Sequence, residues 1–304
     1  MSLYLLAALA PISAAVAYLA TPLSASLARA IGAIDLPDGA RKRHPRATAR
    51  LGGLALLLAL ASVSLPLASR GGLPLALLPG LSLICAVGVA DDVLSLPPTL
   101  KLALQGSVAA VSALLLLPSP TLPHLLGGAL WICLLTNAFN FIDGSDGLAA
   151  GQGAVGGAIL AVLLLTSSAL GIAERPVSSA ALTALLLSAA CVGFLPHNRE
   201  RASVFLGDTG SMLIGHALGA LSLSAPAAVA PTVLLAPHAL PLADLVFAIL
   251  RRARRGVSIF EADRGHVHHR MADAGYAPHE IAIILCTVSL AVGALGLASL
   301  MRYR

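Results

Sequence analysis

Long apolar segments recur along the whole chain and constrain its fold more than any other feature. A helix that crosses the hydrocarbon core of a bilayer needs about 20 mostly apolar residues. Of the 304 residues, 58% are hydrophobic and only 11% are charged, whereas soluble domains have about 25% charged residues. The sequence therefore predicts a single all-α, polytopic membrane domain over residues 1–304, with about ten transmembrane helices. The candidate spans are residues 3–22, 51–69, 73–90, 100–117, 121–139, 152–171, 177–195, 210–224, 229–250 and 280–301.

The first of these spans does not have the pattern of a cleavable signal peptide. It lacks a basic segment in front of the apolar run, and the run is longer than the apolar region of a usual signal. We therefore expect the segment to stay in the protein as a membrane helix.

The basic residues are divided unequally between the two ends of the predicted helices. Fifteen of the nineteen Lys and Arg residues fall in the odd-numbered connections, if Lys101 is counted at its helix start. By the positive-inside rule, these connections are expected in the cytoplasm and both termini outside. Most acidic residues lie in the same connections, which the rule does not explain and which indicates a functional site on this face. The connections are residues 29–50, 91–99, 140–151, 196–209 and 251–279.

The stretch "NAFNFIDGSDGLAAG" places four polar residues at the end of an apolar segment. Asn137 and Asn140 are three residues apart, as are Asp143 and Asp146, so each pair would share a face of a continuing helix. The glycines among them indicate that the helix instead opens into a loop. Their oxygen atoms, with close backbone approach, suit a hard cation together with phosphate.

Two further stretches carry acidic residues at the same face. In "ADDVLSLPPTLK", Asp91 and Asp92 repel each other, so one keeps its proton or both need a cation, unless the pair is a solvated helix end. Lys101 is either a partner for a phosphate or carboxylate, or an anchor that reaches to the membrane interface. In "VFLGDTGSMLIG", Asp208 is either a helix cap or part of a site for a metal and phosphate.

Two basic stretches complete the pattern. "RKRHPRATARLGG", residues 41–53, suits either contact with anionic lipid or a patch that faces phosphate. "FEADRGHVHHRM" holds Arg264, His266, His268 and His269. The histidine spacing allows a zinc site, but no cysteine or H-E-x-x-H pattern accompanies it. With arginines on both sides, these histidines are better interpreted as hydrogen-bond donors to an anion.

Taken in order, these motifs resemble those of the polyprenyl-phosphate N-acetylhexosamine-1-phosphate transferases. The matching stretches are "ARLGG", "DD" followed by Lys101, "NAFNFIDGSDGLAAG", "FLGDTGS" and "DRGHVHHR". The "HVHH" pattern is similar to the bacterial undecaprenyl-phosphate GlcNAc-1-phosphate branch, whereas the peptidoglycan branch has three consecutive histidines. The resemblance implies a multi-pass protein of the bacterial plasma membrane, with catalytic loops in the cytoplasm.

The resemblance also implies roles for the residues singled out above. Mg²⁺, or Mn²⁺ in its place, would be held by Asp208 and Asn140. Asp146 would lie near the uridine, with Asn137 as a further substrate-binding residue. The phosphates and sugar would be held by the loop that contains Arg264, His266, His268 and His269. The catalytic residues around the diphosphate and the lipid phosphate would be Asp91, Asp92, Lys101 and Asp143.

The implied reaction joins a UDP-N-acetylhexosamine, with UDP-GlcNAc expected, to polyprenyl (undecaprenyl) phosphate and releases UMP. It would be the first membrane step in making a cell-envelope glycan such as lipopolysaccharide or a cell-wall polymer. No nucleic-acid partner is expected, and a homodimer is an arrangement that the sequence leaves open. A secondary transporter is the alternative, with Asp244 as its candidate spanning carboxylate. An intramembrane aspartyl protease and a CDP-alcohol phosphotransferase match the motifs less well.

Overall fold

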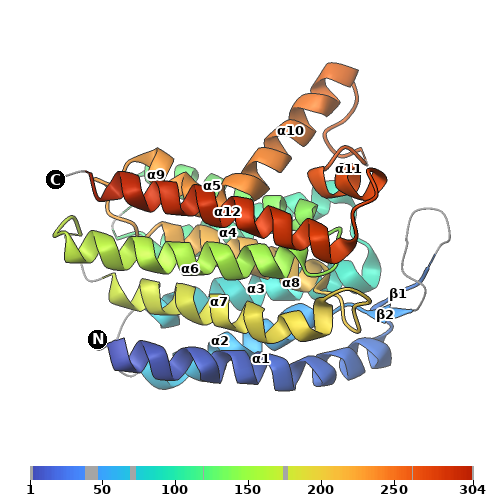
Figure 1. The fold of residues 1–304 in the computed structure, drawn as a ribbon, viewed down its shortest axis with the longest axis horizontal. Helices are drawn as coiled ribbons and strands as arrows, with labels where there is room; N and C mark the ends of the chain where they lie inside the picture. Colours follow the sequence, from blue (N-terminus) through green and yellow to red (C-terminus); the bar gives the residue numbers. More distant parts are fainter. Residues whose placement is uncertain are drawn as a thin grey trace.

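The computed structural model of the protein describes residues 3–37, 47–68, 73–118, 120–173, 177–261 and 263–302. Within these ranges the chain is almost entirely helical, which confirms the predicted fold class (Figure 1). Two short strands, β1 (Ile34–Asp35) and β2 (Thr48–Ala49), pair antiparallel. The helices are α1 (Leu3–Ile31), α2 (Gly52–Ala68), α3 (Leu73–Leu94), α4 (Pro98–Leu116), α5 (Leu122–Ile142), α6 (Leu148–Ala169), α7 (Ser178–Asn198), α8 (Gly207–Ser222), α9 (Pro231–Leu235), η1 (Ala236–His238), α10 (Ala239–Arg255), α11 (Val267–Asp273) and α12 (Pro278–Leu300).

Each of the ten predicted spans corresponds to helix, but not all of these helices are of equal length. Among the described residues, eight segments are long and apolar enough to cross a membrane. The predicted spans 51–69 and 210–224 form the shorter helices α2 and α8. The predicted span 229–250 is divided into α9, η1 and α10. In Figure 1, α10 leaves the direction of the other helices and projects away from the bundle.

Helix α8 lies inside the bundle, where it packs against α3 and α5. Every residue from Thr209 to Ser222 is buried. Two glycines allow other helices to approach the start of α8 closely. A Cβ atom on Gly53 would lie 2.4 Å from the Gly210 backbone, and one on Gly88 would lie 2.4 Å from Thr209 Cα. The beginning of α8 is therefore fixed between α2 and α3.

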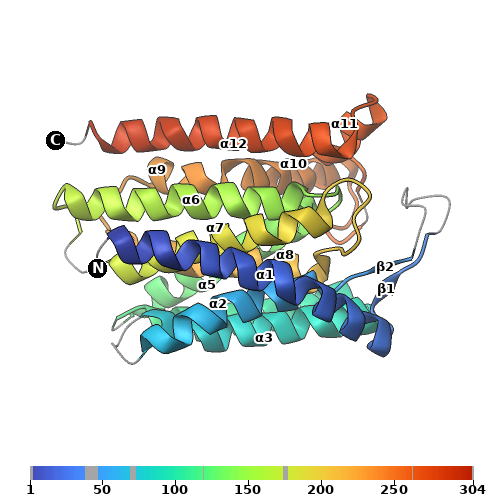
Figure 2. The same cartoon turned by 60° about the horizontal axis from the view of Figure 1, so that its bottom comes forward.

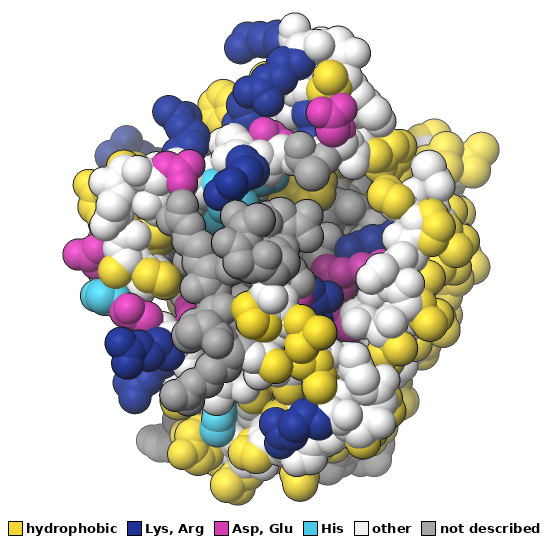
Figure 3. Space-filling model, turned by 90° about the vertical axis from the view of Figure 1, so that its right-hand side faces the viewer, with side chains coloured by type: hydrophobic (Ala, Val, Ile, Leu, Met, Phe, Trp, Pro, Cys, Tyr) yellow, Lys and Arg dark blue, Asp and Glu magenta, His cyan; other side chains and the backbone are white. Residues whose placement is uncertain are grey.

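The odd-numbered connections meet at one end of the molecule, as the charge pattern predicts. This end holds β1, β2 and α11 in Figures 1 and 2, whereas both termini lie toward the other end. Figure 3 looks onto it and shows acidic, basic and histidine side chains gathered there. The basic stretch that precedes β2 falls outside the described residues at positions 41–46. We call this surface the polar end.

Candidate active site

Asp208 stands at the polar end because the chain turns sharply into α8 just before it. Gly207 has a φ of +71°, a backbone conformation that favours glycine. A Cβ atom at this position would also lie 2.6 Å from Oδ2 of Asp92. The glycine of "FLGDTGS" is thus required both by the turn and by the close approach of α3.

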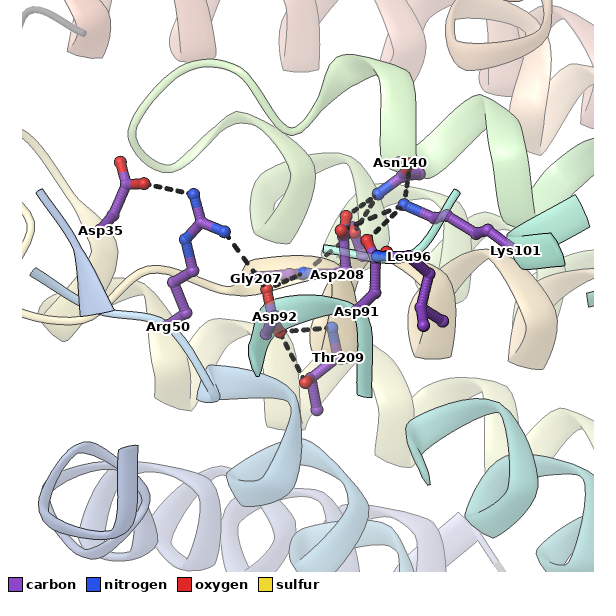
Figure 4. A network of polar contacts seen from close by, with 11 residues as sticks. Asp35, Arg50, Asp91, Asp92, Leu96, Lys101, Asn140, Gly207, Asp208 and Thr209 are labelled. Carbon is purple, nitrogen blue, oxygen red and sulfur yellow. Dashed lines mark hydrogen bonds and ion pairs between the residues drawn. The ribbon is translucent and has the colours of Figure 1, made fainter. Parts of the chain in front are cut away.

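Lys101 lies at the centre of a polar cluster built from four helices (Figure 4). Its Nζ atom is 2.9 Å from Oδ2 of Asp91 and 3.0 Å from Oδ2 of Asp208. The same ammonium donates a hydrogen bond of 3.1 Å to Oδ1 of Asn140. The Asn140 amide nitrogen donates in turn to Asp208 and, at 3.1 Å, to Ser211. The structure therefore brings together four predicted residues from α3, α4, α5 and α8.

The two adjacent aspartates have different surroundings. Successive helix residues point about 100° apart, and here Asp91 faces Lys101 and the amide of Leu96, at 2.9 Å. Both oxygens of Asp92 instead accept hydrogen bonds from the start of α8. They come from the Asp208 amide (3.0 Å), the Thr209 amide (3.0 Å) and the Thr209 hydroxyl (2.7 Å). Asp92 caps α8 from another helix and so holds Asp208 in place.

A basic residue connects this cap to the strand pair. Arg50, next to β2, forms an ion pair with Asp35 in β1, and its Nη1 atom lies 3.9 Å from Oδ1 of Asp92 (Figure 4). The motif "ARLGG" thus contributes to the site through Arg50 and through the close approach of Gly53 to α8.

Asn137 has a different environment from Asn140. Its amide nitrogen donates to Oε1 of Gln105 on α4 and to the carbonyl of Cys133, both at 2.9 Å. No described contact of its side chain reaches Lys101 or the carboxylates around it. In this structure, Asn137 joins α4 to α5 beside the cluster.

The loop between α5 and α6 connects this cluster to the histidines. Asp143, half-buried, lies near other acidic groups. Burial, together with the carboxylates of Asp208 and Asp92, raises the pKa of Asp143 well above its usual range. Oδ2 of Asp146 accepts a hydrogen bond of 3.1 Å from the Ala202 amide, on the connection before α8.

Asp143 gives a prediction about stability. A carboxyl group whose pKa is higher in the folded than in the unfolded chain binds more protons when folded, so stability falls as pH rises between the two pKa values. Asp143→Asn removes the titrating carboxyl group and with it this fall in stability. We expect the variant to have the higher Tm at pH 8, with a smaller difference at pH 5, in thermal unfolding of detergent-solubilised protein. A wild-type-like Tm at both pH values would contradict the raised pKa.

The histidine motif forms the start of α11 and packs on the same loop. His266 and His268 are buried, whereas Arg264 is exposed. A Cβ atom on Gly144 would lie 2.2 Å from Nε2 of His268, so this glycine makes room for the ring. The ring of His269 lies 4.2 Å from that of His268, centroid to centroid. The motif thus closes over the α5–α6 loop.

His268 is a buried polar group without a protein partner. Neither of its ring nitrogens has a hydrogen-bond partner among the described residues. Burial, with the neighbouring imidazoles of His269 and His266, lowers its pKa to about 3, so the ring is neutral at pH 7. Buried polar groups are normally hydrogen-bonded. A ligand that forms a hydrogen bond with one of the His268 ring nitrogens would supply the partner that the described residues do not provide.

Arg252, which the sequence analysis did not single out, has the same property. It is only 5% exposed, and its Nε and Nη1 atoms have no partner among the described residues. Its guanidinium lies 5.3 Å from the ring centre of Phe141, just before Asp143. Asp244, Ala248 and Arg252 are four residues apart and all buried. That spacing is the sequence signal that separates Arg252 from the exposed arginines beside it.

Comparison with known proteins decides the family. Residues 74–225 match the family model described as glycosyl transferase family 4. The chain is also 34% identical to a decaprenyl-phosphate N-acetylglucosaminephosphotransferase of Mycolicibacterium smegmatis, over 94% of this chain and 80% of the relative. The chain belongs to glycosyl transferase family 4. This confirms the resemblance inferred from the motifs and favours a transferase over a transporter.

Other family 4 relatives cover similar shares of the chain. A probable undecaprenyl-phosphate N-acetylglucosaminyl 1-phosphate transferase of Bacillus subtilis is 32% identical over 87% of this chain and 76% of its own. An undecaprenyl-phosphate alpha-N-acetylglucosaminyl 1-phosphate transferase of Salmonella typhimurium is 29% identical over 89% of this chain and 77% of its own. The region of the family 4 model holds the whole Lys101 cluster, whereas the histidine motif lies beyond it.

The Lys101 cluster, formed by Asp91, Lys101, Asn140 and Asp208, has the donor atoms that Mg²⁺ prefers. Oxygens of Asp91, Asn140 and Asp208 converge on one cationic nitrogen, that of Lys101. Mg²⁺ is usually held by one or two carboxylates with water and substrate phosphates, not by an all-protein cage. Accordingly, no group of three or more His, Cys, Asp or Glu side chains in the described ranges has a metal-binding arrangement. The oxygen set of Asp91, Asn140 and Asp208 fits Mg²⁺.

Proposed function

We propose that this transferase moves N-acetylhexosamine 1-phosphate, most specifically GlcNAc 1-phosphate, from a UDP-sugar to a polyprenyl phosphate such as undecaprenyl phosphate. The observation that carries the proposal is the Lys101 cluster, a set of carboxylates around an ammonium at one end of a membrane bundle. The printed names of the relatives, which combine a polyprenyl phosphate with N-acetylglucosamine 1-phosphate, support the same substrates.

In the proposed reaction, an oxygen of the lipid phosphate attacks the sugar-bearing phosphorus of the donor. The bond between that phosphorus and the bridging oxygen breaks, and the bridging oxygen leaves with UMP. Two anions must meet, so the protein's main task is to neutralise charge and align the reactants. Among the described residues, the half-buried ammonium of Lys101 and the buried guanidinium of Arg252 are available for this task.

Asp208, Asn140 and Asp91 would hold Mg²⁺, with Mn²⁺ as the alternative ion. When bound, the ion would neutralise phosphate oxygens and so favour nucleophilic attack. A lipid phosphate is already ionised at pH 7, so a strong general base is not required. If a residual proton remains, Asp91 is the better acceptor of the two adjacent aspartates. Both oxygens of Asp92 are already used to hold α8.

The donor would lie between the Lys101 cluster and the histidine motif. The unpartnered nitrogens of His268 and Arg252 support this position, because both are buried donors near the α5–α6 loop. Asp143, Asp146 and the exposed Arg264 border the same region. The neutral His268 ring keeps one N–H to donate to a phosphate oxygen or a sugar group.

The role of His268 gives a prediction. His268→Ala should raise the donor KM and lower kcat/KM about ten- to a hundredfold, the value of one lost hydrogen bond to a charged group. The KM for the lipid should change less, because its phosphate arrives from the bilayer side. His279→Ala is the matched control, since His279 is exposed at the same end and pairs with Glu200. Unchanged donor kinetics in His268→Ala would remove this residue from the donor site.

We propose that the polar end faces the cytoplasm of the bacterial plasma membrane, where UDP-sugars are available. The expected test places single cysteines in a cysteine-free background. Arg255→Cys, at the polar end, should resist an impermeant thiol reagent added outside intact cells, whereas Ala227→Cys, between α8 and α9, should react. Position 43, in the other basic connection, falls outside the described residues. The reverse labelling pattern would put the site on the wrong side for the donor.

The substrates are tested directly with purified protein in detergent or nanodiscs. In separate reactions, it is incubated with undecaprenyl phosphate and one of UDP-GlcNAc, UDP-GalNAc or UDP-glucose. The masses of the lipid products are measured by mass spectrometry. The proposal predicts a lipid product whose added mass is that of one N-acetylhexosamine phosphate. The proposal would be contradicted if UDP-glucose were the one donor of the three that gave a lipid product. It would also be contradicted if the added mass were that of a sugar without phosphate.

A further inference from the structure

Asp244 is a buried carboxylate to which the proposed reaction gives no role. It lies in the apolar stretch "PLADLVFAIL" of α10 and is 5% exposed. Both of its oxygens are used at the start of α11. Oδ2 is 2.6 Å from Nδ1 of His266, and Oδ1 accepts a hydrogen bond of 2.9 Å from the Val267 amide. A charge buried in this position is retained only when it is paired and hydrogen-bonded.

This pairing fixes the orientation of the His266 ring. An ionised carboxylate accepts hydrogen bonds but cannot donate them, so the proton between the two side chains belongs on Nδ1 of His266. The other ring nitrogen, Nε2, then lies on the side of the ring that faces away from Asp244. The bond to Val267 prevents the carboxylate from turning, since it holds the second oxygen.

The ring held in this way belongs to the histidine motif. It lies 5.8 Å from the His268 ring in a stacked arrangement and 5.4 Å from Phe141, edge to face. Phe141 is also the ring beneath the Arg252 guanidinium. Helix α10 therefore supplies a buried carboxylate and, two turns later, a buried guanidinium on the same side of the helix. Both act where the α5–α6 loop meets α11.

We propose that Asp244 is a positioning residue that orients His266 and holds a proton on its Nδ1, so that Nε2 is presented to a phosphate of the bound donor. This inference rests on the proposed function for the identity of the ligand. A carboxylate and a phosphate both accept hydrogen bonds, so an imidazole held between them contacts both only when each of its nitrogens donates one hydrogen bond. Asp244 thus acts on the donor only through His266.

A double-mutant cycle separates this role from a merely structural one. Asp244→Asn keeps the shape and an oxygen for the Val267 amide, but its amide group can donate to Nδ1. Nδ1 then carries no proton, and the ring can no longer donate from both nitrogens. Alone, it should raise the donor KM and lower kcat/KM about ten- to a hundredfold, the value of one lost hydrogen bond to a charged group. In a His266→Gln background, Asp244→Asn should have no further effect. If the losses of kcat/KM caused by Asp244→Asn and His266→Gln multiplied in the double variant, the proposal would be overturned.

Two comparison variants test whether the effect is specific. Asp263→Asn also loosens the loop before α11, because Asp263 accepts from Arg251 and from the Gly265 amide. Since the described hydrogen bonds of Asp263 go to Arg251 and Gly265 and not to His266, its effect should multiply with that of His266→Gln. Asp244→Glu keeps the charge and should recover part of the activity that Asp244→Asn loses. No recovery in a folded Asp244→Glu protein, or an Asp263→Asn effect that also disappears with His266→Gln, would remove the special role of Asp244.

A substrate-independent measurement keeps this inference distinct from the proposed function. In ¹⁵N-histidine-labelled protein, the His266 signals are those that vanish in His266→Gln. Nδ1 should be protonated in the wild type and should lose its proton in Asp244→Asn. Failure of the wild type to use any UDP-sugar would overturn the proposed function but not this pairing. Unchanged Nδ1 protonation in Asp244→Asn would overturn the pairing itself.

Discussion

Asp208→Asn is expected to lower kcat/KM by about a thousandfold, at the upper end of the loss seen when one preorganised electrostatic group is removed, while the helical bundle remains folded. An amide is a poorer ligand for a hard cation than a carboxylate. The change also removes the negative charge that pairs with Lys101 at 3.0 Å. The fold should persist because α8 is capped by Asp92 through backbone amides that the variant keeps.

The measurement is the rate of product formation across a range of Mg²⁺ concentrations, with circular dichroism and Tm as folding controls. Ser211→Ala is the matched control on the same helix, since Ser211 only accepts from Asn140 and donates to a carbonyl. We expect it to lose less than about tenfold, the value of one ordinary hydrogen bond. Near wild-type activity of Asp208→Asn at sub-millimolar Mg²⁺ would show that Asp208 is only part of the helix start.

Lys101→Met is expected to have two opposite effects. The turnover should fall about a hundred- to a thousandfold, because the variant loses a preorganised cation beside the reacting phosphates. The Mg²⁺ concentration that gives half of the residual activity should also fall. In the structure, the Lys101 ammonium contacts the same oxygens of Asp91, Asn140 and Asp208 that would hold the ion. Removing a competing cation leaves those oxygens more available.

Lys101→Arg is the matched variant for this prediction. It keeps a positive charge but has a larger, planar head group. Its turnover should therefore fall, whereas its Mg²⁺ requirement should not fall as that of Lys101→Met does. An unchanged Mg²⁺ requirement in Lys101→Met would mean that the ammonium and the ion use different oxygens.

The sequence was sufficient to predict the fold class and much of the Lys101 cluster. Apolar runs of about 20 residues leave few alternatives to a helical membrane bundle. The charge pattern predicted that the odd-numbered connections lie on one side, and in the structure they lie at one end of the molecule. Asp91, Lys101, Asn140 and Asp208 were singled out and lie in one cluster. The prediction worked because polar groups at the ends of apolar helices have few structural uses.

What the sequence left open depends on the direction in which each side chain points. Asp91 and Asp92 are adjacent and chemically identical, yet one faces Lys101 and the other caps α8. Asn137 and Asn140 form a similar pair, of which only Asn140 reaches the Lys101 cluster. Helix α10 bends away after η1, which could not be read from the continuous apolar run at 229–250. These differences arise from packing between distant segments.

Arg252 was missed, and Asp244 was singled out only as the candidate spanning carboxylate of a transporter, for a related reason. Arg252 is one of four arginines in residues 251–255, which look like a solvated helix end, and Asp244 lies within an apolar run. Only their common spacing of four, with Ala248 between them, indicates one buried side of α10. A search for periodicity along the helix would have found Arg252 and placed Asp244 on the same side of α10.

UDP-GlcNAc labelled with ³²P on the β-phosphate shows whether the sugar is transferred together with its phosphate. The purified protein is incubated with this donor and undecaprenyl phosphate, and the organic and aqueous phases are counted and analysed. We expect the label to enter the lipid phase and unlabelled UMP to be the nucleotide product. Label that stays in the aqueous phase as UDP, with sugar alone on the lipid, would contradict it.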